Sequence, residues 1–282
     1  MTGLADPRRR SGRAAPRDQA GGYTPVVDEA VTEPGPTLAE PTDEGLRLVD
    51  AADRQGIVLR LFGGVAIWAR CPSARRAPLA RPYNDIDFVT RAGSTSAVTA
   101  FFAGQGYEPN RMFNALHGAQ RLMYADRARG RIVDVLVDRF AMCHRLDLRD
   151  RLVPNARTLP LADLLLTKLQ VVELNEKDLK DLLALLADHD LDGDDAAIGT
   201  ARILAVTGDD WGLEHTIRGT LARVRDAAGS RGLDGTVAEV VCSRIDRLVE
   251  VLDGARKTLR WRMRARLGER VRWYELPEEV GH

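Results

Sequence analysis

Cysteine and histidine are scarce in this sequence, which has three cysteines and five histidines among 282 residues. Cys71, Cys143 and Cys242 lie far apart, and no CxxC or comparable ligand spacing is present. The sequence therefore predicts neither a zinc site nor a disulfide framework. Unpaired cysteines are typical of a reducing compartment, so we expect a cytoplasmic protein.

Long apolar runs and an excess of one charge are also missing. No run approaches the ~20 residues that a transmembrane helix needs, and the first residues, MTGLADPRRRSGRAAPRDQAGG, lack the apolar segment of a secretory signal. We therefore expect no membrane association. Lys plus Arg equals Asp plus Glu, at 41 each, so the chain as a whole lacks the positive field of a nucleic-acid-binding protein, although a local basic face remains an alternative.

Apolar residues make up 44% of the chain, which is enough for a buried core. Residues 1–40 have recurrent Pro and Gly and no apolar period, and we expect a disordered tail there, with a weak nucleic-acid arm as the alternative. Helix and strand patterns alternate over 41–158, whereas the patterns over 159–282 are helical. We expect an α+β fold, with a small mixed sheet and flanking helices in 41–158 and a helical C-terminal domain.

Two acids interrupt an apolar strand in the segment YNDIDFV, residues 83–89. On a strand, Asp85 and Asp87 point to one face while the apolar residues after each of them point to the other. Like charges so close repel each other unless a cation or hydrogen-bond donors compensate them. Carboxylates at this spacing suit Mg²⁺ or Mn²⁺. An exposed strand edge, or ion pairs with Arg75 or Arg81, are the alternatives.

A third acid, Asp134, interrupts the apolar strand 132–137, and a lone Asp in such a strand usually has a partner or a function. Asp138 lies on the same face and is the rival candidate, but it begins the following turn, where solvent reaches it. Upstream, Gly63 and Gly64 end a strand and open a helix. Such a junction lets the backbone approach a bound phosphate, or simply makes a tight turn.

The order Gly-Gly, Asp-x-Asp and a later lone Asp on a neighbouring strand resembles the nucleotidyltransferase superfamily, whose best-known fold relative is DNA polymerase β. The resemblance covers roughly residues 45–190, and its matching residues are Gly63, Gly64, Asp85, Asp87 and Asp134. It implies that the three carboxylates hold two divalent ions, which bridge the triphosphate of an NTP and activate the attacking hydroxyl. It also implies that Asp134 takes the proton of the acceptor and that the glycines cradle the phosphates.

A lysine in a Leu-rich helix, Lys168, is followed by a helix that starts with KDLKDL at 177–182. This pattern resembles the AbiEii-like branch of the superfamily, which includes toxins of toxin–antitoxin and phage-defence systems. The resemblance implies that Lys168 contacts the nucleotide triphosphate and that Asp178 lies at the acceptor side of the nucleotide site. A snorkelling lysine and a helix-start acid are the alternatives. Tyr83 departs from the pattern, because the toxin-like relatives have Ser there.

Together with these observations, the resemblance implies a metal-dependent nucleotidyltransferase that moves a nucleoside monophosphate from an NTP to a hydroxyl of tRNA, a protein or a small molecule. The resemblance adds a toxin role with an antitoxin partner. An antibiotic-type small-molecule adenylyltransferase and a non-catalytic nucleotide-binding module are the alternatives. A third alternative is an RNA-binding protein that uses its Arg-rich ends. Its C-terminal candidate is the basic stretch 260–266, within a helix expected over 237–267. The alternative is that this stretch is the solvent-facing side of the helix, with Trp261 packed inward.

Overall fold

The computed structural model describes residues 37–276, so most of the predicted disordered tail lies outside the described residues. The described helices and strands are, in chain order, α1 (Pro41–Arg54), β1 (Leu59–Phe62), α2 (Gly63–Arg70), β2 (Asp85–Thr90), α3 (Thr95–Gly104), β3 (Glu108–Pro109), α4 (Arg111–His117), β4 (Arg121–Asp126), β5 (Arg131–Val137), β6 (Arg139–Ala141), β7 (Arg145–Asp147), α5 (Leu161–Leu169), α6 (Glu176–Asp188), β8 (Leu191–Asp192), β9 (Ile198–Gly199), α7 (Thr200–Thr207), α8 (Trp211–Ser230), α9 (Gly235–Gly254) and α10 (Leu259–Leu267).

A five-stranded mixed sheet in the order β1-β2-β5-β4-β3 confirms the predicted α+β class. Strand β2 runs parallel to β5, and the other neighbouring pairs are antiparallel. The alternation of apolar and polar residues sets the two faces of the sheet, because successive side chains point to opposite sides. Ile86 and Phe88 of β2 and Val133 and Val135 of β5 are fully buried on one face. The acids of these strands lie on the other face.

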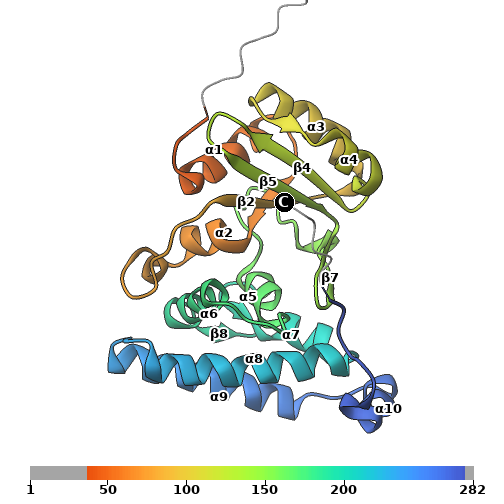
Figure 1. The fold of residues 1–282 in the computed structure, drawn as a ribbon. Helices are drawn as coiled ribbons and strands as arrows, with labels where there is room; N and C mark the ends of the chain where they lie inside the picture. The colour runs from red at the N-terminus through yellow and green to blue at the C-terminus, as the bar shows by residue number, and fades with distance from the viewer. Residues whose placement is uncertain (1–36, 277–282) are drawn as a thin grey trace, which may run out of the picture. The chain divides into compact units, whose positions relative to one another are not determined.

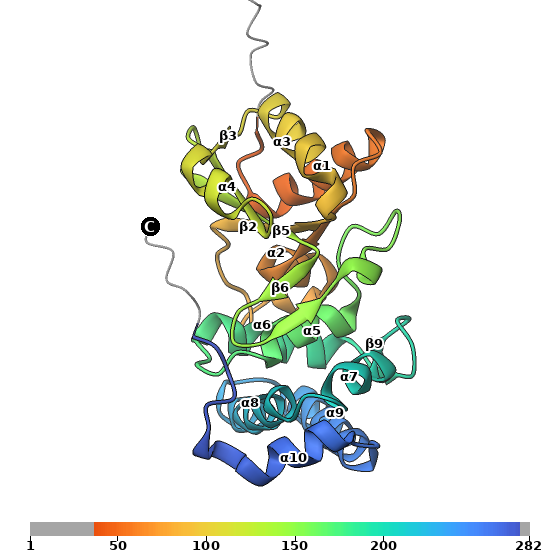
Figure 2. The same cartoon turned by 90° about the vertical axis from the view of Figure 1, so that its right-hand side faces the viewer.

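Helices α1 and α3 pack against the apolar face of the sheet (Figure 1, Figure 2). Phe102 of α3 stacks on Tyr124 of β4 at 4.5 Å between ring centroids and meets Phe88 at 5.9 Å. Leu48 and Val49 of α1 are completely buried. Part of the core therefore lies on this side of the sheet, and it fixes the direction in which the strand acids point.

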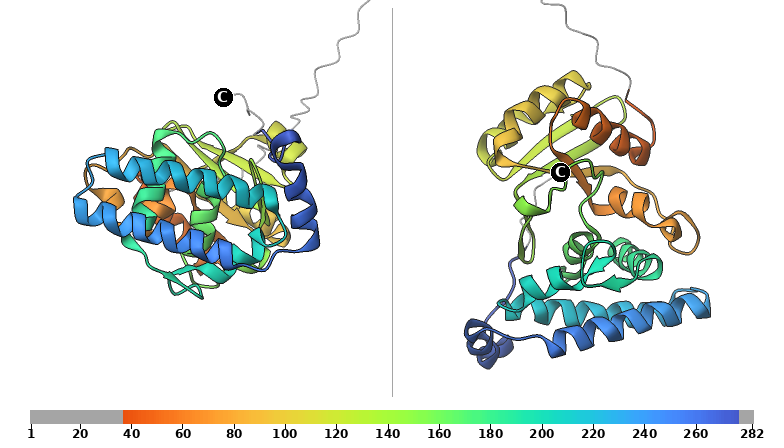
Figure 3. Two further views of the ribbon diagram at one scale, coloured as in Figure 1. Left: turned by 90° about the horizontal axis from the view of Figure 1, so that it is seen from below. Right: turned by 180° about the vertical axis from the view of Figure 1, so that it is seen from behind.

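The second half of the described chain is mainly helical, as predicted, with α8 and α9 side by side (Figure 3). The two-residue strands β8 and β9 are an addition that the sequence did not indicate. The single helix expected over 237–267 is wrong. Helix α9 ends at Gly254, and α10 starts at Leu259, where the Thr258 hydroxyl accepts a hydrogen bond from the Trp261 N–H. A side-chain cap of this kind stabilises a new helix start.

The predicted boundary between the two domains falls near residue 158, where the chain pairs with β1. The Leu61 N–H donates to the Arg157 carbonyl, and the Leu159 N–H donates to the Leu61 carbonyl. The boundary itself stays a prediction. Among the described residues, no helix combines the length and the apolar character that crossing a membrane requires.

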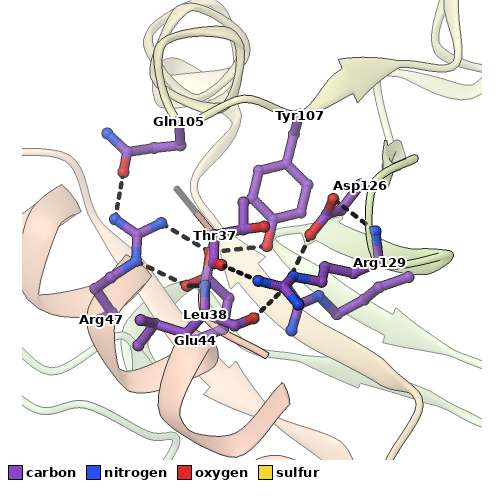
Figure 4. A network of polar contacts seen from close by, with 9 residues as sticks. Thr37, Leu38, Glu44, Arg47, Gln105, Tyr107, Asp126 and Arg129 are labelled. Atoms are coloured by element: carbon purple, nitrogen blue, oxygen red, sulfur yellow. Dashed lines mark hydrogen bonds and ion pairs between the residues drawn. The ribbon is translucent and has the colours of Figure 1, made fainter. Parts of the chain in front are cut away.

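A buried carboxylate, Glu44, joins α1 to the chain around it (Figure 4). It accepts two hydrogen bonds from Arg47 at 2.7 Å, one from the Tyr107 hydroxyl at 2.9 Å and one from the Leu38 N–H at 3.0 Å. Arg47 in turn donates to Gln105 at 2.6 Å. The Glu44 carboxylate is stable when buried because these donors compensate its charge. Removal of the carboxylate would leave each donor without an acceptor.

We expect Glu44→Gln to lower the free energy of unfolding by about 2–3 kcal/mol, because it removes the charge and places an amide among donors. Urea unfolding followed by circular dichroism would measure this loss. Glu108→Gln is the matched control, since the Glu108–Arg127 pair is exposed and should contribute less than about 0.5 kcal/mol. Equal losses in both variants would contradict a special role for the buried network.

Candidate functional site

Three acids gather on the polar face of the sheet. Asp85 and Asp87 lie two residues apart on β2, and Asp87 is the direct cross-strand partner of Asp134 on β5. Asp85 is exposed, while Asp87 and Asp134 are half-buried. Side chains of register partners point to the same face, so the three predicted carboxylates are neighbours.

The two arginines that offered an alternative explanation for the acid pair are engaged elsewhere. Arg75 donates to the backbone carbonyls of Trp68 and Ala69, and Arg81 pairs with Asp181. Among the residues that the structure describes, neither acid of β2 has an ion-pair partner.

The environment of Asp87 opposes its negative charge. Burial raises the pKa of its carboxyl to about 7, and the neighbouring charges of Asp85 and Asp134 add to this rise. Lys168 and Arg121 act in the opposite direction but do not cancel it. A carboxylate with a raised pKa between two other acids is a site where a bound cation would gain much electrostatic energy.

Gly63 is required at the start of α2 by the carboxylate of Asp87. Its φ is +65°, a conformation that residues with a side chain rarely adopt, and a Cβ built on it would lie 2.2 Å from Asp87 Oδ2. The glycine therefore makes room for the acid as well as for the turn.

Gly64 faces the basic loop that precedes β2. A Cβ at this position would lie 2.3 Å from Arg81 Nη2 and 3.0 Å from Tyr83 Cδ1. The Arg81 guanidinium lies 4.2 Å from the centre of the Tyr83 ring, and Asp181 of α6 holds it through two hydrogen bonds at 2.8 and 2.9 Å. The Arg81 guanidinium of this loop is therefore held in a fixed position beside the start of α2.

Lys168 of α5 joins the same ion-pair cluster. Its Nζ lies 2.8 Å from Asp178 Oδ1 and 2.9 Å from Asp181 Oδ2. Burial alone would lower the pKa of Lys168, but the two carboxylates raise it overall, so the side chain stays charged. Its side chain is only 15% exposed, which rules out the snorkelling alternative.

Asp178 lies in the first turn of α6, where its N–H donates to Asn175 Oδ1. It is therefore the helix-start acid of the alternative interpretation and, at the same time, a partner of Lys168. The ion pair holds the side chains of Lys168 and Asp178 next to each other.

Asp134 has a partner that the sequence did not reveal. Its Oδ1 accepts a 2.8 Å hydrogen bond from Arg121 Nε at the start of β4. Asp138, its rival, has φ +61° beyond the end of β5, and its carboxylate accepts a hydrogen bond from the Ala92 N–H. Asp138 thus belongs to a turn and not to the row of strand acids.

The chemistry of the donor set fits a hard divalent cation at Asp85 and Asp87, which are close, oxygen-bearing and without ion pairs. The third carboxylate is committed to Arg121. Within residues 37–276, no group of three His, Cys, Asp or Glu side chains is arranged to hold a metal ion. The three predicted carboxylates share one face of the sheet, and their role as metal ligands stays a prediction.

Three residues of this region, Arg81, Asp181 and Arg121, were not singled out as site residues from the sequence. The Arg-rich loop was a signal for Arg81, and the three-residue spacing from Asp178 along a helix was a signal for Asp181. The partner of Asp134 depends on the register between β4 and β5, and the turn at 126–130, which is typical of a β-hairpin, was the signal for that pairing.

The basic stretch 260–266 forms most of α10, and its aromatic residue packs inward. The Trp261 indole N–H donates to buried Glu214 at 2.9 Å. Its ring is therefore engaged with the protein, as expected for the solvent-facing alternative.

No family model matches the chain, and no curated protein matches it by sequence. A structure of a presumed nucleotidyltransferase from H. pylori is similar over 77% of this chain and 98% of that chain, with 12% identity and a TM-score of 0.36. A structure of a STING-associated CdnE c-di-GMP synthase from Capnocytophaga granulosa is similar over 75% of this chain and 81% of that chain, with 13% identity and a TM-score of 0.20. At scores this low the likeness carries no argument, so the residues of this chain must carry the proposal.

Proposed function

We propose that this protein is a divalent-metal-dependent nucleotidyltransferase, which transfers a nucleoside monophosphate from an NTP to a hydroxyl. One observation carries the proposal. Asp85 and Asp87, without ion pairs among the described residues, share a face with Asp134 directly beside the glycines that open α2. This combination supports the proposal, because carboxylates that suit a metal ion lie next to a helix N-terminus, where a phosphate is favoured.

Asp85 and Asp87 would hold Mg²⁺ or Mn²⁺, with Asp134 as the third proposed ligand. When bound, the ion neutralises the phosphates and the charge that develops on leaving pyrophosphate. Without it, the three acids would repel a triphosphate.

The positive groups of the cluster formed by Arg81, Lys168 and Asp181 suit the polyphosphate end of an NTP. Lys168 has one N–H left after its two ion pairs, and Arg81 has donors beyond the two that bind Asp181. Asp178 and Asp181 hold both cations in place. We therefore add Arg81 to Gly63, Gly64, Lys168 and Asp178 as proposed nucleotide-binding residues.

In the proposed reaction, the acceptor hydroxyl oxygen attacks the α-phosphorus, and the bond from this phosphorus to the pyrophosphate oxygen breaks. Asp134 is the proposed base that takes the hydroxyl proton. Transfer to tRNA, a protein or an antibiotic-like small molecule stays a prediction, as do the toxin role and the antitoxin partner.

The experiment that tests the proposal uses α-labelled NTPs, Mg²⁺ and a lysate as the source of acceptors. We expect label transfer by the wild-type protein and a loss of at least a hundredfold in Asp134→Asn, because the proposed base and ligand is removed. Asp138→Asn is the matched control and should retain activity, since an asparagine tolerates the same backbone conformation and keeps the oxygen that accepts from Ala92. Transfer that survives in Asp134→Asn and disappears in Asp138→Asn would reverse the assignment.

A further inference from the structure

Arg121 is the first residue of β4, and its side chain reaches Asp134 on the neighbouring strand β5. Arg121 and Asp134 lie on neighbouring antiparallel strands as diagonal neighbours, because Asp134 pairs with Met123 and Arg121 pairs with Leu136. The Arg121 guanidinium also lies 5.7 Å from the centre of the Phe113 ring of α4. The Asn114 side chain fixes α4 to β4 through hydrogen bonds with the backbone N–H and carbonyl of Met123.

Because of this placement, one of the three acids has its charge compensated by an arginine, and the other two do not. Asp134 has a guanidinium within 2.8 Å, which compensates its charge and occupies an oxygen that a metal ion would need. Asp85 and Asp87 have no such partner among the described residues. A first divalent ion therefore meets two uncompensated carboxylates, whereas a second ion at Asp134 must displace a cation and would be repelled by it.

We infer that the nucleotide-free protein binds one divalent ion, through Asp85 and Asp87, and that Arg121 holds the place of a second ion on Asp134. This inference rests on the proposed function, and it departs from the two-ion site that the family resemblance implies. A second ion would then enter only with a ligand that supplies further negative charge, such as the NTP itself.

Direct counting of bound Mn²⁺ tests the inference without any enzymatic assay. The probe is Mn²⁺ alone, titrated into the full-length protein without nucleotide and followed by the electron paramagnetic resonance signal of free Mn²⁺. We expect one bound ion in the wild-type protein. Asp134→Asn should still bind a single ion, but more weakly than the wild type, because the variant leaves the Arg121 guanidinium without its carboxylate partner.

The decisive variant is Arg121→Gln, which can still donate a hydrogen bond to Asp134 but carries no charge. We expect it to bind a second Mn²⁺ in the concentration range where the wild-type protein binds one, with an affinity at least tenfold above any weak second binding to the wild type, a change that corresponds to about 1.4 kcal/mol. Arg127→Gln is the matched control, because Arg127 is an exposed arginine of the same hairpin, paired with Glu108. It should bind one ion with the wild-type affinity.

The outcomes separate the inference from the function on which it rests. Two ions of similar affinity in the wild-type protein, or a single ion in Arg121→Gln, would overturn the inference and leave the proposed function standing. No Mn²⁺ bound by the wild-type protein would overturn the proposed metal dependence itself. A purely structural role of Arg121 would change the unfolding temperature of Arg121→Gln but not its number of bound ions.

Discussion

Asp87→Asn should abolish nucleotidyl transfer and, in the absence of metal, make the protein more stable at pH 8. Burial, with the charges of Asp85 and Asp134, raises the pKa of the Asp87 carboxyl from 3.8 to about 7. The folded state therefore favours the protonated acid. Its contribution to stability is complete below about pH 4 and is lost as the pH rises through about 7.

Asparagine has the shape of the acid without its charge, so the variant does not suffer this loss. At pH 8 we expect the metal-free variant to exceed the wild type by about 2–4 kcal/mol in the free energy of unfolding, with little difference at pH 4. Activity should fall by roughly a thousandfold or more, because a proposed metal ligand at the centre of the site is lost.

Urea unfolding at pH 4 and pH 8, first with EDTA and then with Mg²⁺, measures the stability effect. Mg²⁺ should raise the stability of the wild-type protein at pH 8 and leave Asp87→Asn unchanged. Asp150→Asn, at an exposed acid away from the sheet, is the control and should show neither effect. A variant that keeps a tenth of the wild-type activity would contradict the assignment of Asp87. Equal stability of the two proteins at pH 8 would contradict the electrostatic explanation.

Gly63→Ala should damage the same site through sterics. The added Cβ would lie 2.2 Å from Asp87 Oδ2, and the residue would keep a φ of +65°. We expect a loss of about 2–4 kcal/mol in the free energy of unfolding, of which the backbone conformation accounts for about 1 kcal/mol. Label transfer should fall at least a hundredfold, because the carboxylate is pushed from its position.

Gly56→Ala is the matched control, since Gly56 has φ +70° and no atom within 4 Å of an added Cβ. In Gly56→Ala, the free energy of unfolding should fall only by the cost of the backbone conformation, about 1 kcal/mol. In the double variant Gly63→Ala/Asp87→Ala, the carboxylate is gone, so the extra cost of the alanine should shrink to the value in Gly56→Ala. The steric explanation fails if Gly63→Ala destabilises the protein no more than Gly56→Ala does.

The sheet and its acids could be predicted because both depend on local alternation. Apolar residues at every second position determine which face Asp85, Asp87 and Asp134 occupy, whatever the rest of the chain does. The α+β class followed from the same patterns and is confirmed. The roles of these acids stay predictions, since they depend on ligands.

Partners far apart in the chain could not be predicted in the same way. Arg81 and Asp181 are 100 residues apart, and their contact depends on how the loop and α6 meet. Arg121 reaches Asp134 because of the strand register of a hairpin. The break between α9 and α10 was missed because the apolar pattern continues across it, although Gly254 and Thr258 are residues that end and begin helices.

The register between β2 and β5 has a consequence for the evolution of this protein. Asp87 and Asp134 stay on the same face of the sheet as long as the buried valines of β5 stay on the core face, because a one-residue slip would expose all of these valines. Selection for a stable core would therefore also keep the acids on one face. The loops that surround the acids are not held by the strand register. Substitutions in these loops could therefore change the substrate without moving the three acids.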